Sequence, residues 1–415
     1  MKAWALMATG VTLAGCFEKP PFRGDGDGGM PDAGPSPCPG GVVVNADLDG
    51  QGRRVVCGPG YTMRFSDQGY GFPDSFVVGG EELLGHVTTC ADEDRVGLAF
   101  YPAGVVAGGP PPTGQGVDGG RHVDLEVDTP FLVKIGVPWR ASFDACGLAP
   151  QGRSTFTFFP DGRIFRHDHI VDSSAAGAAA CAGSCGPAGA TGWHVTSYWT
   201  FATTAGQTIT PEPPPATSDQ GAGRTLQQLT SCVADDAYAV AVNWIEERPR
   251  RLRRPSPTTS AYVQESLVGE PATLPGDLDD HLHTQLLVRA PASDCAALRT
   301  EVERHTIFNP QLLINDVSLD VAHDGIWGGE NDRGEVGYPV FGTTTLRAGA
   351  IDLVAGWAVW LRFPQLYGHY DVTRASGTPA GTWYQRAALP GTTDVLFWFP
   401  DALTSGDTIT ITPHD

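Results

Sequence analysis

Residues 154–171 read Ser-Thr-Phe-Thr-Phe-Phe-Pro-Asp-Gly-Arg-Ile-Phe-Arg-His-Asp-His-Ile-Val, and they predict two β-strands joined by a tight turn at 160–162. Apolar and polar side chains alternate with a period of two on both sides of this turn, as in strands with one buried face. The same alternation recurs in 121–127, 193–201 and 357–363. We therefore expect an all-β fold, an antiparallel β-sandwich built as one large or two smaller sandwiches.

One helix is expected, over residues 294–304, with Ser293 as its N-cap. The many short strands and frequent Gly and Pro turns otherwise favour a fold with few helices.

The composition excludes several classes of function. The chain has 415 residues, and its 47 acidic against 27 basic residues give a net charge of −20, which argues against a nucleic-acid partner. No lysine follows the glycine spacing of a P-loop. A Gly-x-Gly-x-x-Gly match at 114–119 lies in a Pro-Gly loop rather than at a helix start, so no dinucleotide site is inferred. We expect no cofactor.

The first sixteen residues have the layout of a secretion signal. Lys2 precedes an apolar run over 3–14 that is too short to span a bilayer. The run ends in Leu-Ala-Gly-Cys at 13–16, which resembles the lipobox of bacterial lipoprotein signal peptides. The resemblance implies removal of the signal peptide 1–15 and diacylation of Cys16 (a palmitate-type lipid), so that a membrane becomes a partner through this lipid anchor. The alternative is an ordinary secretion signal with an accidental cysteine.

Residue 17 bears on the location of the anchored protein. In enteric lipoproteins a residue other than Asp after the lipidated cysteine goes with outer-membrane sorting, and Phe17 occupies that position. We expect a protein of the bacterial cell envelope, anchored by lipid to the outer membrane.

Low-complexity segments suggest how the rest of the chain is divided. Residues 16–40 are rich in Gly, Pro and Asp and are expected to form a lipidated flexible tether. A Pro-rich stretch at 211–224 reads as a linker between a β-sandwich half at 41–210 and another at 225–415.

Secretion also explains the cysteines. If the chain's nine cysteines include one lipidated Cys16, an even set of eight remains, which in an oxidising compartment indicates up to four disulfide bonds. Free thiols or a zinc site are the alternative. The pairs that we expect are Cys38–Cys57, Cys90–Cys146, Cys181–Cys185 and Cys232–Cys295.

Residues 129–137, followed by 154–171, resemble the central β-sandwich domains of some polysaccharide lyases and mutarotase-like proteins. The resemblance implies a wide sandwich whose concave face meets a saccharide. The catalytic tyrosine, histidine and arginine of the lyases have no matching positions here, so lyase activity does not carry over.

Several side chains are candidates for ligand binding or catalysis. His167 and His169 are expected on one strand face, and Arg166 on the other. A histidine suits proton transfer near neutral pH, which makes both histidines candidate bases. His194 and Tyr198 share the polar face of another predicted strand.

Metal binding is a weaker hypothesis for four further residues. A second His-x-His pair lies at 281–283, and two such pairs could hold zinc if their strands met in space. An Asp-x-Asp-Gly run at 47–50 opens like a calcium loop but lacks the later glutamate. No metal is assigned, and the residues concerned are His281, His283, Asp47 and Asp49.

Three functions remain open. The first is carbohydrate or envelope binding without catalysis by a lipid-anchored surface protein. The second is a lyase-like, polysaccharide-active enzyme that uses His167 or His169 with Arg166 and Tyr198 nearby. The third is a purely structural surface lipoprotein.

Overall fold

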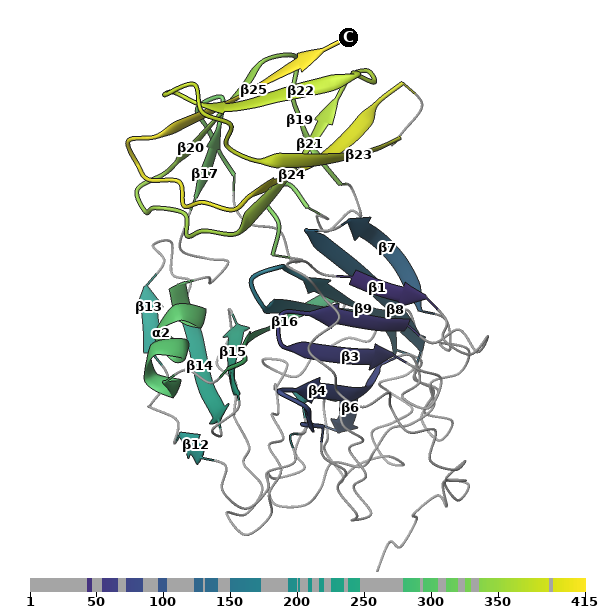
Figure 1. Ribbon diagram of the computed structural model, residues 1–415. Helices are drawn as coiled ribbons and strands as arrows, with labels where there is room; N and C mark the ends of the chain where they lie inside the picture. Colours follow the sequence, from purple (N-terminus) through teal and green to yellow (C-terminus); the bar gives the residue numbers. More distant parts are fainter. Residues whose placement is uncertain are drawn as a thin grey trace, which may run out of the picture.

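A computed structural model describes most of the chain between residues 43 and 415 (Figure 1). The described residues are 43–46, 54–65, 72–84, 96–102, 123–129, 131–140, 150–172, 193–199, 201, 208–210, 216–219, 225–234, 238–246, 279–291, 294–304, 311–319, 325–329, 336–387 and 391–415. Within them, antiparallel strands dominate and one short helix accompanies them, which confirms the predicted fold class. The predicted signal peptide, Cys16 and the tether lie outside these residues.

A nine-stranded sheet forms the centre of the first unit. Its order is β12-β14-β15-β16-β10-β9-β8-β7, and β13 also pairs with β14. The strands are β7 (Asp124–Thr129), β8 (Leu132–Arg140), β9 (Pro150–Phe158), β10 (Arg163–Asp172), β12 (Thr208–Thr210), β13 (Ala216–Asp219), β14 (Thr225–Ala234), β15 (Ala239–Glu246) and β16 (Asp279–Arg289). The hairpin predicted from 154–171 is β9 and β10, two adjacent strands in the interior of this sheet.

A second layer covers one face of this sheet. It contains a five-stranded sheet and the pair β11-β6, which a bridge between Leu84 and Phe201 connects. The strands are β1 (Val43–Ala46), β2 (Arg54–Gly58), β3 (Tyr61–Phe65), β4 (Pro73–Val78), β5 (Glu81–Glu82), β6 (Val96–Pro102) and β11 (Trp193–Trp199).

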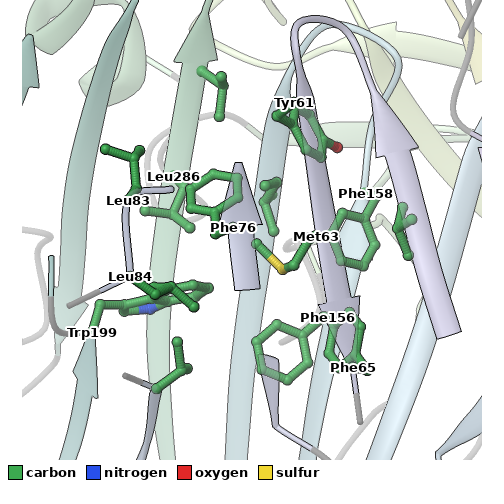
Figure 2. Packing of buried hydrophobic residues seen from close by; sticks show 14 of the residues in the cluster. Tyr61, Met63, Phe65, Phe76, Leu83, Leu84, Phe156, Phe158, Trp199 and Leu286 are labelled. Carbon is green, nitrogen blue, oxygen red and sulfur yellow. The ribbon is translucent and has the colours of Figure 1, made fainter. Parts of the chain in front are cut away.

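Aromatic side chains fill the space between the two layers. Figure 2 shows Phe65 beside Phe156, whose rings lie 5.2 Å apart edge to face. Phe156 also meets Trp199 at 6.1 Å, so the pair β11-β6 shares the same core. Burial of these rings supplies the apolar area that stabilises the sandwich.

The first unit extends past the linker predicted at 211–224. Strand β13 lies inside that stretch, and β14, β15 and β16 continue the sheet that β7–β10 begin. The prediction of a boundary there was therefore wrong. Its Pro-rich composition marked a connection between strands of one sheet rather than a division between units.

Helix α2 (Cys295–Arg304) packs on the β14–β16 side of the sheet, and it confirms the predicted helix. Its first turn differs in detail from the prediction, because the carboxylate of Asp294 accepts a hydrogen bond from the backbone N–H of Ala296. The cap is thus Asp294 rather than Ser293. The disulfide Cys232–Cys295 ties the helix to β14, as predicted. Cys57 is also disulfide-bonded, and the five other predicted disulfide cysteines lie outside the described residues.

Residues 311–415 form a second, smaller sandwich (Figure 1). One sheet has the order β18-β17-β20-β25-β22 and the other β19-β21-β24-β23. The strands are β17 (Leu312–Ile314), β18 (Val317–Leu319), β19 (Tyr338–Pro339), β20 (Thr344–Ala348), β21 (Trp357–Phe363), β22 (His369–Arg374), β23 (Thr382–Ala387), β24 (Thr393–Phe399) and β25 (Thr408–His414).

The two units meet at the β9–β10 turn. Phe159 in this turn packs against Trp398 of β24, with ring centroids 5.9 Å apart. Arg163 stacks over Phe159 at 4.4 Å, forms an ion pair with Asp161 at 2.7 Å and donates a hydrogen bond to the backbone oxygen of Gly356. A buried apolar cluster thus joins the two units. Among the described residues, no helix has both the length and the apolar character needed to cross a membrane.

Breaking the Cys232–Cys295 bond is expected to lower the free energy of unfolding. The bond joins residues 63 positions apart, and loop-closure entropy over that separation corresponds to about 4 kcal/mol. The double variant Cys232→Ala/Cys295→Ala, compared with the parent by chemical denaturation, measures this difference. An unchanged midpoint and slope would contradict a stabilising role for the bond.

Candidate functional site

The nine-stranded sheet has one apolar face, and its opposite face combines polar side chains with apolar ones, such as Phe165 and Leu287, that are buried under the smaller sandwich and α2. Ile164, Phe156 and Leu286 point toward the second layer and are completely buried in its core. Because side chains alternate along a strand, the neighbouring positions of the same strands lie on the opposite face. We call this opposite surface the polar face, and its members are Lys134, Arg153, Thr155, Thr157, His167, His169, His283 and Gln285, with Asp124 and Glu126 of β7.

Three histidines stack on the polar face, and we call them the histidine ladder: His167, His169 and His283. The rings of His167 and His283 are 5.1 Å apart and those of His167 and His169 are 6.3 Å apart, each pair within 9° of parallel. The register explains this arrangement, because β10 and β16 pair His167 with His283 and His169 with His281. The strands of the two His-x-His motifs therefore do meet. His283 is buried, and His167 and His169 are partly exposed.

A charge cluster lies beside the histidine ladder, formed by Asp124, Glu126, Lys134 and Arg153. Glu126 forms an ion pair with Lys134 at 3.3 Å and accepts a hydrogen bond from Arg153 Nε at 2.8 Å. Arg153 also contacts Asp124 at 2.8 Å. Burial alone lowers the pKa of the Arg153 guanidinium, but the two carboxylates outweigh burial and leave this pKa above its ordinary value.

Gly136 makes room for the charge cluster. A Cβ at this position would collide with the Arg153 guanidinium and with the Glu126 carboxylate. Because Gly136 has no side chain, Arg153 and Glu126 can lie flat on the sheet. Thr155 of the next strand is the residue directly opposite Gly136.

Buried polar atoms without hydrogen-bond partners occur on both faces of the sheet, and some of them lie behind these charged side chains. Thr155 Oγ1, Thr157 Oγ1 and both polar atoms of the Gln285 amide are buried, and in the part of the chain that the structure describes they have no hydrogen-bond partner. Each such buried group costs about 1–3 kcal/mol unless something else satisfies it. Thr155, Thr157 and Gln285 are at most 3% exposed, so their polar atoms lie beneath the charged side chains rather than on the open surface.

The metal hypotheses receive no support within the described ranges, where no group of three or more His, Cys, Asp or Glu side chains could hold an ion. His283 stacks with His167 instead. Of the other candidates, Asp47 and Asp49 lie outside the described residues, as does the side chain of His281.

Arg166 lies in the core rather than on the polar face, which argues against its predicted role in ligand binding. Its side chain and that of Asp168 are completely buried on the core face, where they form an ion pair at 3.0 Å. Arg166 also donates a hydrogen bond to the backbone oxygen of Gly97 at 2.8 Å and lies 5.8 Å from the ring of Trp199. The pair thus links β10 to the second layer, on the side of the sheet away from His167.

The structure brings together only part of the predicted site. His167 and His169 share the polar face, whereas Arg166 faces the other way. His194 and Tyr198 lie on β11, which pairs with β6 in the second layer, and their side chains lie outside the described residues. His167 and Arg166 therefore do not share a face, as the lyase-like combination would require.

Sequence reasoning missed the charge cluster and Gln285. Lys134 could have been predicted as a site residue from the sequence. It is one of only three lysines, and it lies within an apolar strand, on the face opposite to Val133 and Ile135. Nothing in the sequence could have predicted that Glu126 and Arg153 pair, because they are 27 positions apart and only the fold of the sheet brings them together.

A second polar cluster lies on the smaller sandwich and is exposed. Asp371 contacts His414 at 2.8 Å and His369 at 3.1 Å. The hydrogen bond with His414, more than that with His369, lowers the pKa of the Asp371 carboxyl. This cluster lies on β22 and β25, separate from the polar face.

No protein-family model matches the chain, and no curated protein matches its sequence. Among solved structures, a galactose mutarotase-like protein from Clostridium acetobutylicum aligns over 60% of this chain and 99% of its own length, with 7% identity and a TM-score of 0.34. Galactose 1-epimerase from Lactobacillus acidophilus aligns over 60% and 98%, with 8% identity and a TM-score of 0.33. A mutant of heparan sulfate lyase HepC from Pedobacter heparinus aligns over 74% of this chain and 41% of its own, with 9% identity and a TM-score of 0.33.

These proteins are of the two kinds that residues 129–171 resemble. Their TM-scores are low, so the role of the polar face has to be inferred from its own residues.

The buried ion pair predicts an asymmetric response to mutation. Arg166→Met leaves Asp168 as an uncompensated buried charge and is expected to lower the free energy of unfolding by about 3–5 kcal/mol. The double variant Arg166→Met/Asp168→Leu removes both charges and is expected to recover most of this loss. Urea denaturation of the parent and both variants tests the prediction, and a double variant no more stable than the single one would contradict it.

Proposed function

We propose that the chain binds a saccharide through the polar face, without catalysis. The observation that carries this proposal is the charge cluster, in which the side chains of Asp124 and Arg153 are 33% and 31% exposed on the sheet. A ligand rich in hydroxyl groups both donates and accepts hydrogen bonds, and so it can pair with a carboxylate and with a guanidinium on the same surface, directly or through water.

The charged side chains of the face also suit this kind of ligand. Glu126 and Asp124 can accept hydrogen bonds from sugar hydroxyls, and Arg153, whose side chain is 31% exposed, can donate them. Hydrogen bonds to charged groups are about twice as strong as those between neutral groups. Neighbouring strands hold these groups on a rigid sheet, which lowers the entropic cost of binding.

Cleavage of a polysaccharide is the second candidate, and the observation that favours it is the partial exposure of His167 and His169 on the same face. A histidine that reaches the substrate could act as a base. Incubation of each bound saccharide with the protein, followed by analysis of chain length, separates the two candidates, since a binding protein leaves the chain length unchanged.

Loss of Arg153 is expected to weaken saccharide binding. The full chain is first applied to a glycan array, and the best ligands are then titrated by calorimetry. Arg153→Gln removes the donor and both ion pairs, and we expect the Kd to rise about tenfold, the equivalent of roughly one strong hydrogen bond.

Arg374→Gln is the matched control. Arg374 also forms ion pairs with two carboxylates, Asp401 and Asp407, but it lies on the smaller sandwich. Its replacement should leave the Kd unchanged. No binding to any glycan, or an equal loss in both variants, would overturn the proposed site.

We also propose that this binding surface is held at the bacterial outer membrane by lipid on Cys16. The support is the Leu-Ala-Gly-Cys sequence at 13–16 and the Gly- and Pro-rich stretch that follows it.

Mass spectrometry of the protein from its native envelope tests the anchor. The expected result is a chain that begins at residue 16 with a diacylated or triacylated cysteine. Cys16→Ser should release the protein from membranes into the soluble fraction. An intact, unmodified cysteine in membrane-derived protein would refute the anchor.

A further inference from the structure

We propose that the edge of the smaller sandwich formed by β22 and β23 is a second binding site, which takes a neutral saccharide. In this site Asp371 accepts hydrogen bonds from sugar hydroxyls, and the rings of His369 and Trp383 contact the C–H groups of a sugar ring. The site goes beyond the proposed function, because it lies on another unit than the polar face and uses none of its residues.

Three aromatic rings lead from the core to the surface at this edge. β22 and β23 are the terminal strands of the two sheets of the smaller sandwich. The ring of Trp383 on β23 lies 5.1 Å from that of Tyr370 and 6.0 Å from that of His369, both on β22. Tyr370 is buried, Trp383 is partly exposed and His369 is exposed. Figure 1 shows β22 and β25 on the side of the smaller sandwich away from the first unit.

Asp371 holds two imidazoles beside these rings. Its Oδ1 lies 3.1 Å from His369 Nε2, and its Oδ2 lies 2.8 Å from His414 Nε2. The hydrogen bond with His414, more than that with His369, lowers the pKa of the Asp371 carboxyl, so that this group is ionised at neutral pH and only accepts. Nε2 of each imidazole therefore donates to Asp371, and Nδ1 is an acceptor whenever the ring is neutral.

This combination of groups fits a sugar ring. A pyranose carries hydroxyl groups at its rim and C–H groups on its faces, so it suits an aromatic ring with hydrogen-bonding groups beside it. Each carboxylate oxygen of Asp371 has a second lone pair that can accept a hydrogen bond from a hydroxyl. The side chains of His369, Asp371 and His414 are 61%, 57% and 47% exposed, so a ligand can reach them.

Stability does not account for the cluster. Exposed ion pairs such as those of Asp371 contribute little to the free energy of unfolding. A tryptophan that stays partly exposed also forgoes part of the hydrophobic stabilisation that full burial would give. These residue types at one edge are therefore better explained by a ligand than by the fold.

The charge around the cluster favours neutral over acidic sugars. Asp371 is joined by Asp415, which follows His414 in the chain and accepts a hydrogen bond from Gln365 at 3.3 Å. Arg374, the arginine of β22, is paired with Asp407 at the other end of the strand. The chain as a whole carries a net charge of −20. Carboxylate or sulfate groups on a ligand are repelled by such a surface, whereas hydroxyl groups are not.

Calorimetry of the full chain tests the site. The probes are two neutral saccharides, a cello-oligosaccharide and a manno-oligosaccharide, and one acidic saccharide, oligogalacturonate. Each is titrated into the parent and into the Arg153→Gln variant, in which the polar face is weakened. We expect at least one neutral probe to bind in both proteins, and to bind the Arg153→Gln variant more tightly than oligogalacturonate does.

Two variants remove different parts of the site. Asp371→Asn replaces the charged acceptor by an amide of the same shape, and we expect the Kd of the neutral probe to rise about tenfold, the equivalent of one hydrogen bond to a charged group. Trp383→Leu keeps an apolar side chain against Tyr370 but removes the aromatic ring, and it should also raise the Kd. Thermal melting shows whether both variants are folded. If Trp383→Leu unfolds, Asp371→Asn at its exposed position still decides.

Phe341→Ala is the matched control. Phe341 is an aromatic residue that is 84% exposed, and it follows β19, at the opposite edge of the sheet that contains β23. Its loss should leave the Kd unchanged.

The outcomes separate this inference from the proposed function. A Kd that Asp371→Asn does not change, an equal loss in Phe341→Ala, or tighter binding of oligogalacturonate to the Arg153→Gln variant would overturn the second site. Absence of binding by both neutral probes would do the same. Affinity that falls only in Arg153→Gln would support the polar face alone, and affinity that falls only in Asp371→Asn would support the second site alone.

Discussion

The pairing register between β10 and β16 is the constraint on which the arrangement of the site depends. It places Ile164 opposite Leu286 on the core face and His167 opposite His283 on the polar face. Because side chains alternate strictly along a strand, a slip by one residue would bring histidines into the aromatic core and expose apolar side chains. The free energy of burying that core therefore also holds the imidazoles in their stack.

The local pattern of the sequence was enough to predict much of this fold. The period-two alternation of residues 154–171 predicted a hairpin and assigned His167 and Arg166 to opposite faces, and the structure agrees. Helix α2 and its disulfide to β14 were also predictable, since each has a local cue in a cap or a cysteine. The boundary between the two units could not be located from the sequence, because a proline-rich composition is equally typical of a loop within a sheet.

What the sequence could not predict is non-local. The role predicted for Arg166 required its face of the strand to be exposed to solvent. In the structure this face is instead covered by the second layer, where Arg166 meets β6 and Trp199. A buried arginine is stable here because Asp168, two residues along the same strand, supplies the opposite charge. The charge cluster likewise arises only when β7, β8 and β9 lie side by side. Function on this sheet thus follows from strand order as much as from motifs.

The turn between β9 and β10 belongs structurally to both units. Its Phe159 and Arg163 contact Trp398 and Gly356 of the smaller sandwich. The strand that follows the turn contains His167 and His169. The smaller sandwich is therefore not an exchangeable module. A chimera in which another domain replaced the smaller sandwich would lose the packing against the β9–β10 hairpin, which carries the imidazoles. The two units should therefore be expressed and engineered together.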